Sequence, residues 1–259
     1  MSGDANRIMP GTWLWLLIRL CAMIALTERS LGERDIRGSE TSVRHGGLIA
    51  TPVKDPELVR VRRAQIVKAA TRLFSEKGYH GTTTREIARE SGLGTGTLYE
   101  YVSSKEDILY LVCDMIHSEV EGKLRLVVPA GARVIEVLPP VLAGFFRVMD
   151  ELQELVLLIY QETKSLPPNY MRHVLRREAE ITDHFAELLR AGIADGSFTV
   201  APEVVSLMAH NITVLGQMWA FRRWTLHQTY SLQTFTETQT SLIMRELCAP
   251  TEAWTDDEG

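Results

Sequence analysis

The segment from residue 66 to residue 108 constrains the fold of this chain more than any other part of its 259 residues. Apolar side chains recur in it at helical spacing, and glycines interrupt the pattern at residues 78 and 92. Hydroxylated residues stand where new helices would begin. We therefore predict three short helices joined by tight turns, with a fourth helix starting directly behind them.

The first predicted helix covers residues 57–77. Its apolar stripe follows the i, i+3, i+4, i+7, i+8 spacing of a single helix face. The stripe consists of Ile66, Ala69, Ala70, Leu73 and Phe74. Gly78 is suited to end this helix, because glycine adopts the left-handed backbone conformation without a steric penalty.

A capping box marks the start of the second predicted helix. Thr83 and Glu86 have the required spacing, with a hydroxyl at the N-cap and a carboxylate three residues later. The chain then reverses at residues 91–93, around Gly92, and the third predicted helix spans residues 95–101.

Residues on the third predicted helix are suited to contact with DNA. Thr95 and Thr97 offer short hydrogen-bonding groups, and their methyl groups can meet a thymine methyl. Gly96 lets the backbone approach phosphates closely, and Tyr99 and Tyr101 can donate phenolic hydrogen bonds to phosphate oxygens. The pattern is typical of a helix-turn-helix that places its third helix in the major groove. The alternative is a small helical bundle whose threonines and tyrosines only face solvent.

The same stretch resembles the DNA-binding domain of the TetR family of bacterial transcriptional regulators. The matching residues are Ala69, Ala70, Leu73, Phe74, Gly78, Thr82, Thr83, Ile87, Ala88, Gly92, Gly96, Thr97, Leu98, Tyr99, Tyr101, Ser104, Lys105 and Glu106. Two positions depart from the family pattern. Gly94 stands where serine is common, which implies one phosphate contact fewer, and Val102 is a smaller core anchor than the usual phenylalanine.

The resemblance implies which residues meet DNA. They are Thr83, Thr84, Thr95, Gly96, Thr97, Tyr99, Tyr101 and Lys105. Arg85 is a further candidate for a base or phosphate contact. Lys105 lies near a predicted helix N-terminus, where backbone amides also favour phosphate.

The charge of the chain is unevenly distributed. The net charge is −5, yet residues 54–110 carry 10 Lys and Arg against 8 Asp and Glu, whereas residues 111–259 carry 12 against 20. The weak positive charge of the first region predicts few phosphate neutralisations and salt-sensitive binding. Arg60, Arg62 and Arg63 are candidates for DNA backbone or minor-groove contacts, or else form a solvated basic turn.

Residues 1–54 form the first predicted region. Residues 13–26 are almost all apolar, but Arg19 interrupts them, and the run is too short to span a bilayer comfortably. The run also fits a signal peptide poorly. We expect a disordered extension or a start codon set too far upstream, with a membrane anchor as the third alternative.

The chain is predicted to be all-α, with a three-helix helix-turn-helix domain at residues 55–103. A helical ligand-binding and dimerisation domain follows at residues 104–248, and residues 249–259 form an acidic tail. A second capping box, Ser103 with Glu106, is predicted to open the helix that joins the two domains. The helices expected in the second domain span residues 104–126, 133–150, 152–164, 169–194, 203–222 and 231–247.

Prolines, an asparagine and a glycine give the expected boundaries of these helices. The pair Pro139-Pro140 is predicted to kink or split its helix. Asn169 is a candidate cap for the long helix that Gly196 ends, and Pro202 is at a favourable first position of the next helix.

The last two predicted helices carry apolar stripes that belong either to the core or to an interface. Their members are Val204, Leu207, Met208, Ile212, Leu215, Trp219, Leu242 and Ile243. The family resemblance implies that these helices pair with those of a second subunit, so we expect a homodimer that binds double-stranded operator DNA. Two helix-turn-helix domains that bind one DNA, which we call the two reading heads, also increase specificity.

The effector site is the least determined part of the prediction. Residues 159–167 and 219–224 resemble TetR-type repressors of fatty-acid and acyl-CoA degradation, which implies an acyl-CoA thioester as effector. An acyl chain needs an apolar tunnel, and the CoA phosphates need cations. Candidate ligand residues are Phe145, Met149, Tyr160, Gln161, Lys164, Arg176, Trp219 and Arg223. Each is also explained by packing or by helix-surface ion pairs.

The sequence contains no pattern that favours catalysis, a cofactor or a metal. Its cysteines and histidines lack ligand spacing, so we expect reduced thiols and a cytoplasmic protein without stable membrane association. We therefore predict a repressor that a small effector releases from its operator. The alternatives are an activator that no ligand controls, and an acyl-CoA-binding protein with a vestigial helix-turn-helix.

Overall fold

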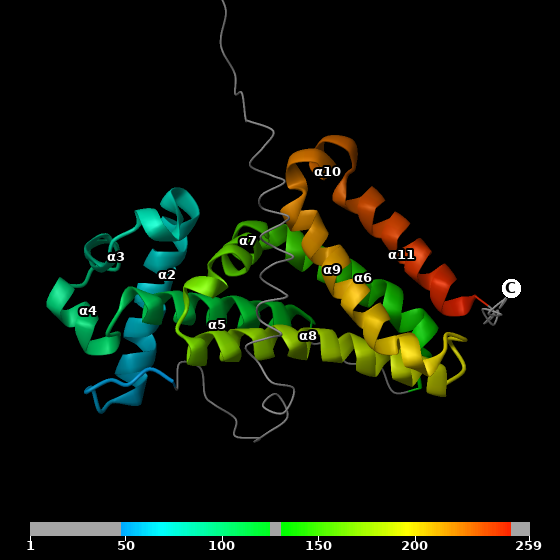
Figure 1. Cartoon of the computed structure of the whole chain (residues 1–259), viewed down its shortest axis with the longest axis horizontal. Coiled ribbons are helices and arrows are strands. Elements are labelled where there is room, and N and C mark those ends of the chain that lie inside the picture. The colour runs from blue at the N-terminus through cyan, green and yellow to red at the C-terminus, as the bar shows by residue number, and fades with distance from the viewer. Residues whose placement is uncertain (1–47, 125–130, 250–259) are drawn as a thin grey trace, which may run out of the picture. The chain divides into compact units, whose positions relative to one another are not determined.

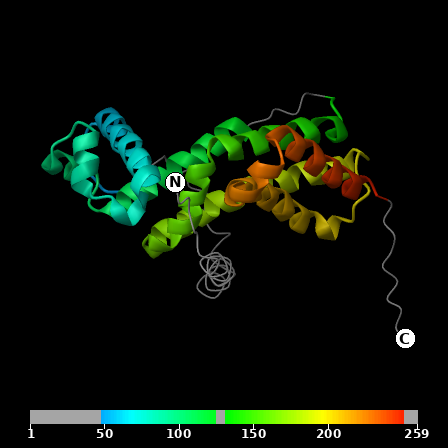
Figure 2. The ribbon, with the colours of Figure 1, turned by 90° about the horizontal axis from the view of Figure 1, so that it is seen from above.

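The computed structural model describes residues 48–124 and 131–249, and every regular element within these ranges is a helix. This confirms the all-α prediction. The helix-turn-helix elements lie at one end of helix α5 (Lys105–Leu124), as both views show (Figures 1 and 2). The helices after α5 pack along it and beyond its other end, and two of them also contact the helix-turn-helix core. Residues 1–47 of the predicted extension and residues 250–259 of the predicted tail lie outside the described residues.

The helix-turn-helix consists of α2 (Pro56–Gly81), α3 (Thr84–Glu90) and α4 (Thr95–Tyr101). Gly78 interrupts the helical geometry of α2 with a φ of 74° and a ψ of 162°, so the regular helix ends where the sequence predicts. Gly92 has a φ of 71° at the turn between α3 and α4. The bounds of α4 agree with the prediction.

The start of α5 differs from the prediction by one residue. Ser104 Oγ accepts a hydrogen bond of 3.1 Å from the Asp107 amide, and Asp107 Oδ2 accepts one of 2.7 Å from the Ser103 amide. The predicted box of Ser103 and Glu106 is therefore wrong. Glu106 accepts instead a 3.2 Å hydrogen bond from the Tyr79 hydroxyl, which diverts it from the helix terminus.

The second domain begins with α6 (Val134–Glu151), α7 (Gln153–Glu162) and the 3₁₀ turn η1 (Thr163–Ser165). The long helix α8 (Pro168–Ala194) follows, and then the 3₁₀ turn η2 (Pro202–Val204) and helix α9 (Val205–Phe221). The described chain ends with α10 (Arg223–Thr229) and α11 (Leu232–Cys248). The sequence analysis did not separate α10 as an element.

Helix α6 is one helix through Pro139 and Pro140, so the predicted split does not occur. The N-terminal amides of α6 donate hydrogen bonds to residues outside this helix. The Val134 amide donates to Asp195 Oδ2 at 2.8 Å, and the Ile135 amide donates to Ser197 Oγ at 3.2 Å. These bonds from the connection after α8 satisfy amides that have no partner within a helix.

The N-cap of α8 is Pro167, and Asn169 lies within the first helical turn, so the predicted Asn169 cap is wrong. Pro168 at the first position has the backbone angle of a helix and no amide hydrogen to leave unpaired, which explains why the helix starts there. At the other end Gly196 has a φ of 73°, in agreement with the predicted stop.

Two apolar cores share the long helices. The first core joins the helix-turn-helix to Leu158 of α7 and Tyr170 of α8, whereas the second fills the space among α6, α8, α9 and α11. Ile49 is buried in the first core, and the Thr51 hydroxyl donates to the Glu100 carbonyl at 2.7 Å. The packed structure therefore includes residues that the sequence analysis assigned to the extension.

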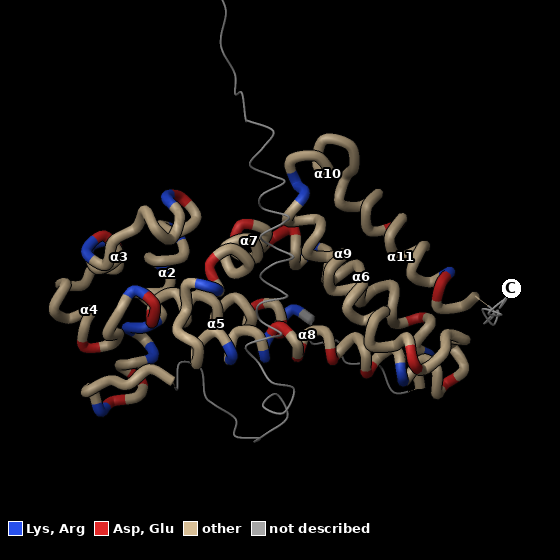
Figure 3. Tube along the Cα trace, in the orientation of Figure 1, with Lys and Arg blue, Asp and Glu red and all other residues tan. Residues whose placement is uncertain are grey.

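Charged residues of both signs are interspersed on the helix-turn-helix and on the long helix α8 (Figure 3). Arg72 pairs with Glu76 and with Glu90, which joins α2 to α3. Some of the basic side chains of this region are therefore neutralised by ion pairs within the fold.

Candidate functional site

The start of α3 is fixed by the predicted capping box. The Glu86 amide donates to Thr83 Oγ1 at 3.3 Å, and the Thr83 amide donates to Glu86 Oε2 at 2.9 Å. Lys77 Nζ donates to the other carboxylate oxygen of Glu86 at 2.6 Å. The bond from Lys77, followed by those from Thr83, lowers the pKa of Glu86 to about 2.

Helix α4 presents polar groups to solvent beside the start of α3. Thr95, Gly96 and Tyr99 are exposed, and 47% of the surface of Tyr99 is accessible to solvent. The Thr84 and Tyr99 hydroxyls lie 3.0 Å apart. This contact places the beginning of α3 and the middle of α4 on one surface, which we call the α3–α4 face.

Most of the residues expected at DNA lie on or near this face. Thr83 and Arg85 are exposed, whereas Thr84, Thr97 and Lys105 are half-buried. Lys105 Nζ lies 4.3 Å from the centre of the Tyr79 ring, and burial lowers the pKa of Lys105. Its ammonium is thus positioned by a cation–π contact.

Tyr101 departs from the expected pattern, because it is only 4% exposed. It lies three residues after Leu98, on the helix side that packs into the first core. We therefore remove Tyr101 from the residues that we propose to meet DNA.

The arginines of α2 have different roles. Arg60 pairs with Glu57 at 2.6 Å on the surface. Arg63 is half-buried, and it donates to the Tyr101 carbonyl at 3.1 Å and to the Ile49 carbonyl at 2.9 Å. Arg63 thus ties the segment before α2 to the end of α4, a role that sequence reasoning missed because these residues are far apart in the chain.

The described part of the second domain contains a partly open cavity of about 30 Å³ between α5, α6, α7, α8 and α9. Its wall is mostly apolar. The lining residues are Ile116, His117, Val120, Phe145, Met149, Val156, Ile159, Tyr160, Glu178, Ile181, Thr213 and Gln217. This volume accommodates about two water molecules.

The structure brings three of the expected ligand residues together in this wall, namely Phe145, Met149 and Tyr160. The others lie elsewhere. Gln161, Lys164 and Arg176 are exposed, and Arg223 pairs with Glu154. Trp219 is buried, but its indole nitrogen donates to Asp150 Oδ1 at 2.7 Å in the neighbouring core.

A polar cluster that the sequence analysis missed borders the cavity. His117 Nε2 lies 3.3 Å from Glu178 Oε2, and Gln217 Nε2 donates to Glu178 Oε1. These three residues come from α5, α8 and α9. No local pattern could reveal them, because only tertiary packing brings residues 117, 178 and 217 together.

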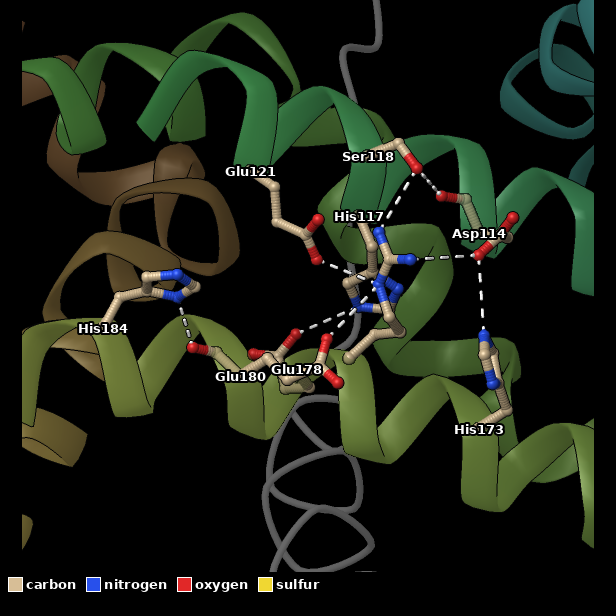
Figure 4. Close-up of polar contacts among 9 residues, drawn as sticks. Asp114, His117, Ser118, Glu121, His173, Glu178, Glu180 and His184 are labelled. Atoms are coloured by element: carbon tan, nitrogen blue, oxygen red, sulfur yellow. Dashed lines mark hydrogen bonds and ion pairs between the residues drawn. The ribbon is translucent and has the colours of Figure 1, made fainter. Parts of the chain in front are cut away.

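A second set of charges joins α5 to α8 beside this cluster (Figure 4). Arg177 contacts Asp114 at 3.6 Å, Glu121 at 2.9 Å and Glu180 at 3.7 Å. His173 lies 3.6 Å from the same Asp114. Within the described ranges, no group of His, Cys, Asp and Glu side chains is arranged to hold a metal ion.

Two parts of the chain match known families. Residues 66–110 match bacterial regulatory proteins of the tetR family, and residues 131–222 match the tetracyclin repressor-like C-terminal domain. Among solved structures, a bacterial regulatory protein in the tetR family from Rhodococcus RHA1 has the same fold. Its TM-score is 0.63 at 23% identity, with 72% of this chain and 97% of that chain covered.

Curated proteins give closer sequence relatives. The HTH-type transcriptional regulator HbdR of Aromatoleum sp. (strain CIB) is 32% identical over 190 residues, which cover 73% of this chain and 82% of the relative. The HTH-type transcriptional repressor KstR2 of Rhodococcus jostii (strain RHA1) is 30% identical over 151 residues, which cover 57% of this chain and 72% of the relative. The chain therefore belongs to the TetR family of helix-turn-helix transcriptional regulators.

Proposed function

We propose that this regulator represses transcription by binding operator DNA through the α3–α4 face, and that a small effector releases it. The observation that carries the first part is the exposed polar surface of α4, joined to α3 by the contact between Thr84 and Tyr99 at 3.0 Å. The name of the relative KstR2 describes a repressor, which supports repression over activation for this protein. Such a protein acts in the cytoplasm, where its DNA is.

On this face, α4 enters the major groove. Thr95, Gly96, Thr97 and Tyr99 meet the DNA, and the start of α3 contacts the phosphate backbone through Thr83, Thr84 and Arg85. Lys105 adds a phosphate contact from the start of α5. Backbone contacts dominate the affinity, so binding weakens as salt is raised.

The protein binds DNA as a homodimer through α9 and α11. Val204, Leu207, Val214 and Leu242 are between 39% and 64% exposed in the single chain. Ile212, Trp219 and Ile243 of the predicted stripes belong instead to the core. Large exposed apolar residues on η2, α9 and α11 support a protein–protein interface.

The stretch Pro202–Phe221 is also long and apolar enough to cross a membrane by composition, and 44% of its most apolar 18 residues are buried. Core helices of soluble proteins meet the same criterion. A second subunit would cover the exposed part of this stretch, so we propose no membrane partner.

The effector binds in the cavity among α5, α6, α7, α8 and α9. Related proteins carry names that refer to lipid-like compounds, namely a fatty acid metabolism regulator of Bacillus subtilis and the ketosteroid regulator KstR2 of Mycobacterium tuberculosis. Together with the apolar wall, these names support an acyl-CoA thioester as effector. The cavity of about 30 Å³ is too small for an acyl chain, so binding requires the helices to separate.

This separation of the helices couples effector binding to the position of the helix-turn-helix. Ile116 of α5 and Ile159 of α7 both line the cavity and both pack against the core of the helix-turn-helix. Widening the cavity displaces these residues and changes the placement of the reading head. The effector then lowers operator affinity in proportion to its preference for the widened state.

The CoA phosphates would be held by cations at the surface of the domain. Arg177 and Arg223 are engaged in ion pairs with acidic side chains. Arg172 and Arg176 are exposed one turn apart on α8, and no ion pair involves them within the part of the chain that the structure describes. Because they are exposed and carry no such ion pair, we propose them as the phosphate-binding cations.

DNase I footprinting of the DNA upstream of the protein's own gene tests this proposal, with and without a panel of CoA thioesters. We expect two protected half-sites with a separation that matches whole helical turns, and loss of protection with one thioester. Absence of any footprint would contradict the DNA-binding role. A footprint that no thioester removes would favour the alternative of an activator without ligand control.

A further inference from the structure

The cavity has an apolar wall and one polar end, and we call this end the Glu178 subsite. It consists of His117, Glu178 and Gln217, with Thr213 beside them. The Glu178 side chain is 35% exposed, whereas the His117 side chain is 2% exposed. The subsite therefore reaches from the solvent boundary of the domain into its interior.

The hydrogen-bonding groups of the Glu178 subsite are mostly acceptors. Both carboxylate oxygens of Glu178 accept from neighbours, and each keeps a further lone pair. When His117 Nε2 donates to Glu178, Nδ1 of the neutral imidazole is an acceptor as well. This Nδ1 atom is buried, and it has no hydrogen-bond partner among the residues that the structure describes.

The Thr213 hydroxyl does not supply the missing donor. The Thr213 hydroxyl donates to the Ala209 carbonyl at 3.1 Å and lies 3.1 Å from the Thr182 hydroxyl. Gln217 directs an amide hydrogen at Glu178. An acceptor-rich, partly buried subsite of this kind is stabilised by a ligand that brings a donor.

We propose that the Glu178 subsite recognises a hydroxyl group on an otherwise apolar effector. A hydroxyl donates to Glu178 or to His117 Nδ1 and carries no charge. A ketone presents only lone pairs to these acceptors, and a carboxylate is repelled by the carboxylate of Glu178. The proposal deepens the proposed function, on which it rests, by giving the effector's chemical class as a hydroxylated, uncharged acyl or alicyclic group.

The first experiment uses small probes that need no CoA. Cyclohexanol, cyclohexanone and cyclohexanecarboxylate share one ring and differ in the group presented to the subsite. Binding to the full chain is followed by NMR of the methyl groups of Met149 and Ile181, which line the cavity. We expect cyclohexanol to bind roughly tenfold more tightly than the ketone, and the carboxylate to bind most weakly.

A variant tests whether Glu178 is the origin of the preference. Glu178→Gln removes the charge and supplies an amide donor, so we expect the alcohol and the ketone to bind with similar affinity and the carboxylate to gain affinity. Glu187→Gln, at an exposed position of the same helix, is the matched control and should keep the wild-type order. Because the wild-type order is measured without any variant, the test does not depend on the stability of Glu178→Gln.

Three results would overturn the inference. They are equal binding of alcohol and ketone to the wild type, preferential binding of the carboxylate, or no methyl shifts with cyclohexanol, which would leave the cavity as a site for water only. A parallel assay compares operator release by 3-hydroxyacyl-CoA and by the unsubstituted acyl-CoA. Equal release by both would contradict the Glu178 subsite and keep the proposed function, whereas no release together with an alcohol preference would contradict the thioester effector alone.

Discussion

The contact between Tyr99 and Thr84 provides a test of the α3–α4 face at the scale of one atom. Tyr99→Phe removes the hydroxyl that lies 3.0 Å from Thr84 Oγ1. We expect operator affinity to fall about fivefold, the effect of losing a hydrogen bond worth about 1 kcal/mol. Fluorescence anisotropy with labelled operator measures the change.

The matched control is Tyr230→Phe, because Tyr230 is 46% exposed and follows α10, away from the α3–α4 face. We expect this variant to bind the operator as the wild type does. Equal losses in both variants would show that the Tyr99 hydroxyl has no specific role at the DNA.

Close packing beside the cavity predicts a second residue effect. A Cβ atom at Gly216 would lie 2.3 Å from Phe145 Cε1, closer than any real contact. Gly216→Ala should therefore lower the free energy of unfolding by about 1–3 kcal/mol through overpacking. Urea denaturation measures it. Gly144→Ala is the control, since its Cβ would meet no atom within 4 Å, and an unchanged stability of Gly216→Ala would contradict the close contact.

Sequence reasoning at this scale succeeded where a residue acts through its own neighbours. The Thr83–Glu86 box was predicted correctly because both partners belong to one helical turn. Tyr101 and Glu178 depend on packing between distant helices. Tyr101 was therefore expected at the surface although it is buried, and Glu178 was not recognised as part of a polar cluster.

At the scale of elements, Asp195 holds the start of α6. Its hydrogen bond with Ser197, followed by the one from the Val134 amide, lowers the pKa of Asp195. A carboxylate with a lowered pKa contributes stability above the unfolded-state pKa of about 3.9, and this contribution is lost as the pH falls through the folded-state pKa. Asp195→Ala should therefore lower Tm at pH 7.

Calorimetry or circular dichroism across pH checks this prediction. The difference in Tm between the wild type and Asp195→Ala should be constant near neutrality and shrink below about pH 4. Asp183→Ala, at an exposed position of α8, should leave Tm almost unchanged. A difference that persists undiminished at low pH would contradict the role of the ionised Asp195 in capping α6.

The same element shows why some boundaries could not be predicted. Pro139 and Pro140 oppose a helix locally, but Asp195 and Ser197 secure the first amides of α6 from another part of the chain. Helix α10 was missed because it is only seven residues long, buries none of its residues and has no side-chain cap at its start. Helices α3 and α4 were predicted closely because caps and glycines are local signals.

At the scale of the molecule, the proposed dimer interface includes the exposed side of α9. Leu207 is 64% exposed in the single chain, so Leu207→Glu places a charge in the proposed interface without disturbing the core. We expect light scattering to show a monomer where the wild type is a dimer, and operator affinity to fall strongly because two reading heads no longer act together.

Leu58→Glu is the control for this variant, because Leu58 is 38% exposed on α2, outside α9 and α11. It should keep the mass of the wild type. A Leu207→Glu variant that remains dimeric would move the interface away from α9.

The division of the molecule into a helix-turn-helix and a second helical domain was predicted from the helix-turn-helix pattern. The connection between them was predicted only in part, through α5. The structure adds α7, whose Leu158 packs into the core of the reading head while its Val156 lines the cavity. These residues lie on different sides of one short helix, and a sequence does not reveal which neighbours each side meets.

The most direct test of ligand control is the operator affinity of the wild-type protein, measured by fluorescence anisotropy at fixed salt, with and without CoA thioesters. Coupling between two sites typically changes affinity by about 5–150-fold. We predict a fall within this range for one thioester, and a full recovery when that thioester is removed. An operator affinity that stays constant across the whole panel would contradict release by an acyl-CoA effector.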